Sequence, residues 1–71
     1  MMMTIDQIRE YLERVIAERR LSGDRVGLKE LQIAAGFLMA AADYAGDKDS
    51  ALRFRVLAAE AANKREELTG D

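Results

Sequence analysis

The residues of this chain that could do chemistry are its carboxylates and its basic side chains, because the sequence contains no cysteine and no histidine. These absences remove thiolate nucleophiles, imidazole bases, disulfides and the usual zinc and haem sites. Asp43 is the most conspicuous carboxylate, since it falls in the last turn of a predicted apolar helix, where the helix dipole disfavours negative charge. No second carboxylate is placed to form an acid–base pair with it. We therefore predict a structural ion pair between Asp43 and Arg53 or Arg55, with no enzymatic activity, no catalytic residue, no metal and no cofactor.

Basic side chains gather near the first predicted turn, and an up-down-up arrangement of helices brings two more to the same end: Arg19, Arg20, Arg25 and Lys29, with Lys64 and Arg65. Such a cluster could bind a phosphate or an acidic partner. Carboxylates share this end, however, namely Glu30, Glu66, Glu67 and Asp71. Arg19 and Arg20 also complement the negative end of the first helix dipole. The pattern favours a mixed, solvated end over an anion-binding site.

The charge balance argues against a nucleic-acid binder, because 11 basic residues stand against 13 acidic ones and the net charge is −2. A helix-turn-helix reading of residues 28–37 fails on the residues that follow. Its recognition helix would be "LMAAADYAGD", residues 38–47, which carries no arginine, lysine, glutamine or asparagine to reach base edges. A nucleic-acid role is therefore kept only as an alternative.

The apolar stretch from Ile33 to Ala42 is uninterrupted but much shorter than the ~20 residues that a membrane-spanning helix needs. The helix that contains it lacks the basic margins of a helix lying on a membrane surface. The N-terminal "MMMTIDQIRE" has no basic region followed by an apolar run and no cleavage pattern. We therefore predict no membrane association, no signal peptide and a cytoplasmic location.

Helices must position these groups, because proline is absent, aromatic residues are few and strong helix formers dominate. Thr4 and Gln7 match a capping box at the start of the first helix. Gly23 and Asp24 provide a turn residue and a cap candidate before the second helix. Gly46 is suited to a left-handed end of that helix, and cap candidates for the third follow it: Asp47, Asp49 and Ser50.

The chain is predicted to be a single all-α domain over residues 1–71, with a disordered start at 1–3 and a frayed end at 69–71. Short turns favour antiparallel neighbours, so an up-down-up three-helix bundle is the expected topology. Its helices span about residues 4–20, 25–45 and 49–68.

The predicted helices differ in how many apolar faces they carry. The first has one stripe, formed by Ile5, Ile8, Leu12, Val15 and Ile16. The second has two nearly opposite faces, one with Leu28, Leu31, Ala35, Leu38, Met39 and Ala42, and another with Ile33, Phe37, Ala40 and Tyr44. The third also has two, one with Leu52, Val56 and Ala59, and another with Phe54, Leu57, Ala58, Ala61 and Leu68.

A monomeric three-helix bundle needs one buried stripe from each helix, so the second and third helices carry more apolar surface than a monomer requires. The surplus would form an exposed patch or meet another chain. We therefore predict association through these two helices, most simply as a homodimer, with interface residues Ile33, Phe37, Tyr44, Phe54, Leu57, Ala61 and Leu68. The alternative is a monomer in which the third helix rotates to absorb its second face.

These features favour a small, non-enzymatic helical module for protein–protein interaction, which self-associates and acts by binding a protein partner. A bacterial or phage accessory or regulatory protein fits this description. The alternative, from another class, is a dimeric transcriptional or nucleic-acid-associated regulator in which dimerisation brings the basic helix ends together.

Overall fold

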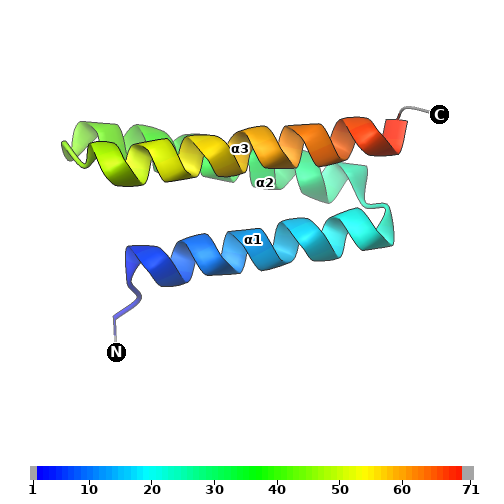
Figure 1. The fold of residues 1–71 in the computed structure, drawn as a ribbon, viewed down its shortest axis with the longest axis horizontal. Coiled ribbons are helices and arrows are strands. Elements are labelled where there is room, and N and C mark those ends of the chain that lie inside the picture. Colours follow the sequence, from blue (N-terminus) through cyan, green and yellow to red (C-terminus); the bar gives the residue numbers. More distant parts are fainter. Residues whose placement is uncertain (1, 70–71) are drawn as a thin grey trace.

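The computed structural model describes residues 2–69, with side chains up to residue 68, and within that range the chain forms three α-helices: α1 (Ile5–Ser22), α2 (Arg25–Tyr44) and α3 (Lys48–Thr69). Figure 1 shows that consecutive helices run antiparallel, so that α2 returns along the bundle and α3 returns again. The predicted all-α, up-down-up bundle is confirmed. Residue 1 of the predicted disordered start and residues 70 and 71 of the predicted frayed end lie outside the described residues.

The start of α1 is fixed by the capping box that the sequence predicts. The Gln7 backbone N–H donates to the Thr4 hydroxyl at 3.1 Å, and the Thr4 N–H donates to the Gln7 side-chain oxygen at 2.9 Å. Each bond satisfies a backbone donor that the first helical turn leaves without a partner.

Both turns contain a glycine in the left-handed conformation, followed directly by an aspartate that caps the next helix. Gly23 has φ 72°, and Asp24 accepts a 2.8 Å hydrogen bond from the Gly27 N–H at the start of α2. Gly46 has φ 79°, and Asp47 accepts a 3.1 Å bond from the Ser50 N–H at the start of α3. Only glycine adopts such φ values without strain, which explains both positions. Of the three predicted cap candidates, Asp47 is the one that caps α3.

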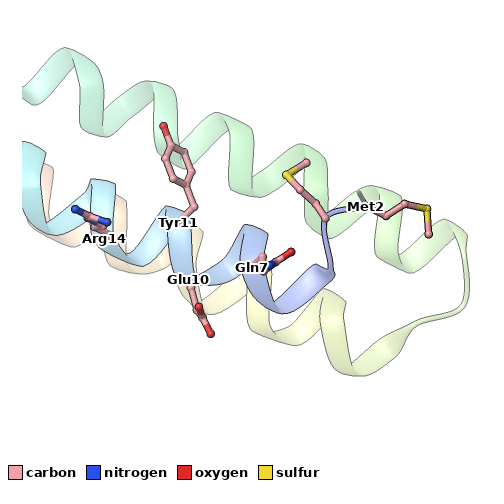
Figure 2. Close-up of a pocket in the computed structure, with 6 residues that line it drawn as sticks. Met2, Gln7, Glu10, Tyr11 and Arg14 are labelled. Carbon is pink, nitrogen blue, oxygen red and sulfur yellow. The ribbon is translucent and has the colours of Figure 1, made fainter.

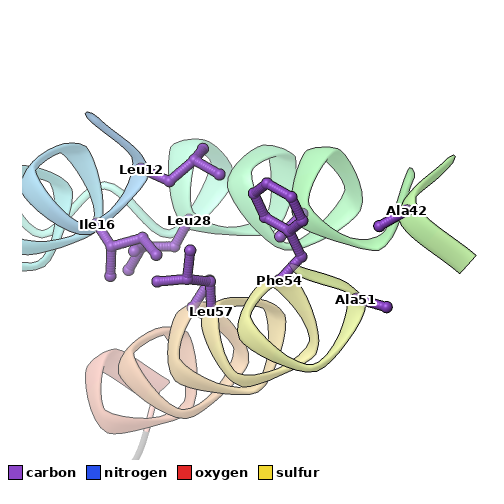
Figure 3. Close-up of a cluster of buried hydrophobic side chains, with 9 residues drawn as sticks. Leu12, Ile16, Leu28, Ala42, Ala51, Phe54 and Leu57 are labelled. Carbon is purple, nitrogen blue, oxygen red and sulfur yellow. The ribbon is translucent and has the colours of Figure 1, made fainter. Parts of the chain in front are cut away.

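The core lies mainly between α2 and α3, which pack against each other more extensively than either packs against α1. α2 contributes the buried Leu28, Gly27, Ala35 and Ala42. Its partly buried Leu31, Leu38 and Met39 pack against the same cluster. α3 contributes the large side chains of Phe54 and Leu57, and Figure 3 shows the Phe54 ring reaching from α3 toward α2. α1 closes the core with its predicted stripe, of which the buried members are Leu12, Val15 and Ile16.

One prediction about α3 is wrong, because its two apolar faces are assigned the wrong way round. Phe54, Leu57 and Ala61, expected to face outward, are 1%, 2% and 0% exposed. Leu52 and Val56, expected to face inward, are more than half exposed. The physical reason is volume: α2 presents the small Ala35 and Ala42 to the core, and close packing favours the bulkier face of α3 beside them.

Candidate protein-interaction surface

The outer face of α2, as we call it, consists of Val26, Ile33, Phe37, Ala40 and Tyr44, all of them exposed. It lies on the opposite side of the helix from the buried Leu28, Ala35 and Ala42. Phe37 is 73% exposed and Tyr44 92% exposed, so both aromatic residues of α2 point away from the core. The face is uncovered from the first turn of the helix to the last.

The structure separates the residues predicted for an interface into two groups. Ile33, Phe37 and Tyr44 are brought together on the outer face of α2. The four from α3 are not part of it: Phe54, Leu57 and Ala61 are buried in the core, and Leu68 is half-buried against it. Val26 belongs to the face but was missed in the sequence, although its position seven residues before Ile33 is the signal that places it there.

The margins of this face differ in chemistry. One margin carries Lys29, Gly36 and Asp43, spaced seven residues apart, so that a cation lies near one end, an anion near the other and a glycine between them. Space around Gly36 is open, since a Cβ built there would meet nothing within 4 Å. The other margin carries the exposed Ala34 and Ala41. A single charged residue, Glu30, interrupts the face itself.

Asp43 forms the predicted ion pair, but with a different cation. Its Oδ1 lies 3.4 Å from the Lys48 Nζ, and both side chains are exposed. Arg53 instead contacts Asp49 at 3.2 Å, and no ion pair of Arg55 occurs within residues 2–69. The turn is so short that the first residue of α3 comes back beside the last turn of α2, which is why Lys48 reaches Asp43 first. An exposed pair of this kind contributes ~0–1 kcal/mol.

The basic end of the bundle is mixed in charge. Arg20 Nε donates to Glu67 at 2.9 Å, and Lys64 lies 3.7 Å from the same carboxylate. The hydrogen bond from Arg20 holds the pKa of Glu67 below its ordinary value. Arg19 lies 3.6 Å from the cap residue Asp24. A shallow hollow at this end is lined by Arg25, Val26, Lys29, Arg65 and Glu66. Asp71, also expected here, lies outside the described residues.

The two shifted carboxylates of the described residues owe their pKa values to local hydrogen bonds. Residues 2–69 contain no group of three or more carboxylates that could hold a metal ion. The pKa of Asp47 is lowered, but its causes are the side-chain and backbone hydrogen bonds with Ser50 that cap α3. This shift, like that of Glu67, belongs to the scaffold.

A hollow on α1 is lined by Met2, Met3, Gln7, Glu10, Tyr11 and Arg14. Figure 2 shows that Tyr11 and Glu10 point to opposite sides of α1 and that Tyr11 points toward α2. A binding pocket for a small molecule instead needs polar groups that converge on an enclosed space.

Comparison with protein-family models, with curated proteins and with solved structures gives no match for this chain. Among residues 2–69, no helix combines the length and the apolar character needed to cross a bilayer. Function has to be inferred from the surface that the fold presents, and its most distinctive part is the outer face of α2.

Proposed function

We propose that the chain is a small, non-enzymatic helical module for protein–protein interaction. It self-associates and acts by binding a protein partner, and the outer face of α2 is the surface that makes the contact. The observation that carries this proposal is the exposure of Val26, Ile33, Phe37 and Tyr44 in one row. None of these four side chains belongs to the buried core.

Energetics support an interface at this face. A buried aromatic side chain removes ~150–250 Å² from water, so the exposed parts of Phe37 and Tyr44 together amount to roughly 300 Å². A stable interface buries about 800 Å² on each partner, and aromatic residues are enriched at its centre. The two rings would thus supply a substantial part of the area that one side of an interface needs.

The alternative of a nucleic-acid-associated regulator has weaker support. Two of the arginines on which it relied, Arg19 and Arg20, lie against Asp24 and Glu67. Their positive charge is thereby offset locally, and the net charge of the chain stays at −2.

The proposal is tested by changing Phe37 to Asp and measuring the molar mass by light scattering across a range of concentrations. We expect the wild-type chain to associate and Phe37→Asp to be monomeric, because a charge would have to be buried at the interface. Circular dichroism should show unchanged helix content, since Phe37 contributes little to the core.

The matched control is Leu52→Asp, which places the same charge on the exposed apolar side of α3. This variant should associate as the wild type does. Dissociation by Leu52→Asp but not by Phe37→Asp would move the interface to α3 and contradict the proposal. So would a wild-type chain that stays monomeric at micromolar concentrations, or a Phe37→Asp variant that unfolds.

A further inference from the structure

We infer that the partner is a second copy of this chain, whose α2 packs antiparallel against the outer face of α2 about a two-fold axis midway between Ile33 and Phe37. This inference rests on the proposed function and deepens it by assigning the orientation and register of the two helices. Three observations carry it: the order of residues along the face, the charges on its margin and the position of Gly36.

The outer face has the spacing of a coiled-coil seam. Its positions alternate between steps of four and three residues, in the order Val26, Glu30, Ile33, Phe37, Ala40 and Tyr44. The opposite, buried face of the same helix has the plain seven-residue repeat of Leu28, Ala35 and Ala42. α2 can therefore pack on its own chain and on a second helix at the same time.

The seam is self-complementary when the second helix is antiparallel. Ile33 then faces Phe37 of the second copy, and Val26 faces Tyr44, so large side chains meet in both layers. Glu30 faces Ala40, the smallest side chain of the seam, which leaves the carboxylate a path to water. Each pair occurs twice, as an isologous interface requires.

The charged margin gives a second, independent reason for this orientation. A two-fold axis between antiparallel helices brings the same margin of each copy together. Lys29 of one copy then faces Asp43 of the other, and the pair occurs twice. Lys29 has no ion-pair partner of its own within residues 2–69, and Asp43 has only the exposed contact with Lys48. Gly36 falls near the axis, where its missing side chain lets the two backbones approach.

A parallel arrangement fits the same residues poorly. It places Glu30 directly against Glu30 of the second copy, which sets two carboxylates together in the seam. It also places Lys29 against Ala34 rather than against an acid, so neither ion pair forms. Like charges at facing positions are unfavourable, and orientation in coiled coils is commonly set by such terms.

The orientation is tested by disulfide cross-linking, for which the chain is suited because it has no cysteine of its own. Glu30→Cys and Ala40→Cys each place one thiol on the seam without removing a large apolar side chain. Each variant alone and an equimolar mixture are equilibrated in a glutathione redox buffer, so that disulfides form where thiols are held together. Mass spectrometry then separates mixed from identical pairs. Ala17→Cys, at an exposed position of α1, gives the background.

We expect the mixture to yield the mixed disulfide at least tenfold above background, with each variant alone at background. Identical positions would lie about ten residues, or roughly 15 Å, apart along the helix axis, too far for a disulfide. Disulfides in each variant alone would show a parallel pair, which overturns the inference but leaves the proposed interface intact.

No product above the Ala17→Cys background would also overturn the inference. Light scattering of Phe37→Asp then decides whether the proposed function fails with it. Loss of association in that variant keeps the outer face as the interface. Unchanged association removes both the orientation and the surface.

Discussion

The two faces of α2 show opposite uses of apolar residues. On the inner face Leu28, Ala35 and Ala42 are buried, and Leu31, Leu38 and Met39 are partly buried against the core. The outer face carries the larger side chains Ile33 and Phe37, and it is mostly exposed. A helix that served only its own core would not also direct an aromatic ring outward, because burial of an aromatic ring contributes more than burial of an alanine.

In this fold the hydrophobicity of a residue does not by itself determine whether the residue is buried. Phe54 and Phe37 are the same residue type in adjacent helices, yet one is 1% exposed and the other 73% exposed. The inner face of α2 allows α3 to approach closely because it is small, and Phe54 then fills the remaining space. Phe37 lies on the opposite side of α2 and stays outside this packing.

The largest expected effect comes from truncating the buried Phe54, and the exposed Phe37 provides the matched comparison. Phe54→Ala should lower the free energy of unfolding by about 3–5 kcal/mol, because it leaves a cavity in the centre of the core. A single core in a domain of this size supplies only roughly 3–5 kcal/mol, so the variant should be largely or partly unfolded at room temperature. Phe37→Ala should change the unfolding of the monomer by less than about 0.5 kcal/mol. Urea titrations followed by circular dichroism measure both.

Concentration separates the roles of the two residues further. Association stabilises the folded state by mass action, so the wild-type urea midpoint should rise with protein concentration. In Phe37→Ala this rise should shrink or vanish. Equal losses of stability in Phe54→Ala and Phe37→Ala at low concentration would contradict the division into an inner and an outer face.

An intermediate effect is expected from enlarging the small residues of the inner face. Ala35 is fully buried, and Ala35→Leu forces three further carbon atoms between α2 and the rest of the core. Overpacking of this kind costs about 1–3 kcal/mol. The control is Ala17→Leu, on the exposed side of α1, which should be nearly neutral. A stabilised Ala35→Leu would reveal unfilled space at the inner face and weaken the argument from volume.

The sequence predicts those features that depend on neighbouring residues. The capping box of Thr4 and Gln7, the cap at Asp24 and the left-handed Gly46 are local patterns, and all are found in the structure. The exposure of Phe37 and Tyr44 also follows from periodicity, because these residues lie opposite the inner face.

Features that depend on contacts between helices were predicted less well. α3 has two apolar pairs, Leu52 with Val56 and Phe54 with Leu57. Periodicity places each pair on its own face of the helix, but it does not show which face packs against α2. The cation beside Asp43 was missed for a related reason. Arg53 and Arg55 are near it in sequence, but the geometry of the turn brings Lys48 closer.

The smallest effect concerns two exposed carboxylates near the two ends of α3, Asp47 and Glu67. The pKa of Asp47 is lowered by its hydrogen bonds with Ser50, and that of Glu67 by the hydrogen bond from Arg20. A lowered pKa in the folded state means that the ionised form stabilises the fold at pH values above the unfolded pKa, which is about 4. That contribution is lost as the pH falls through the folded pKa.

We therefore expect the urea midpoint to fall between about pH 5 and pH 3. The fall should be smaller in the double variant Asp47→Asn, Glu67→Gln, whose side chains do not titrate. Both measurements belong in the Phe37→Asp background, because association would otherwise add its own pH dependence. If the urea midpoint fell equally with and without the double substitution, the charges of Asp47 and Glu67 would not contribute to the stability of the fold. The packing of Phe54 in the core between α2 and α3 would then be enough to decide which side of α2 is left for a partner.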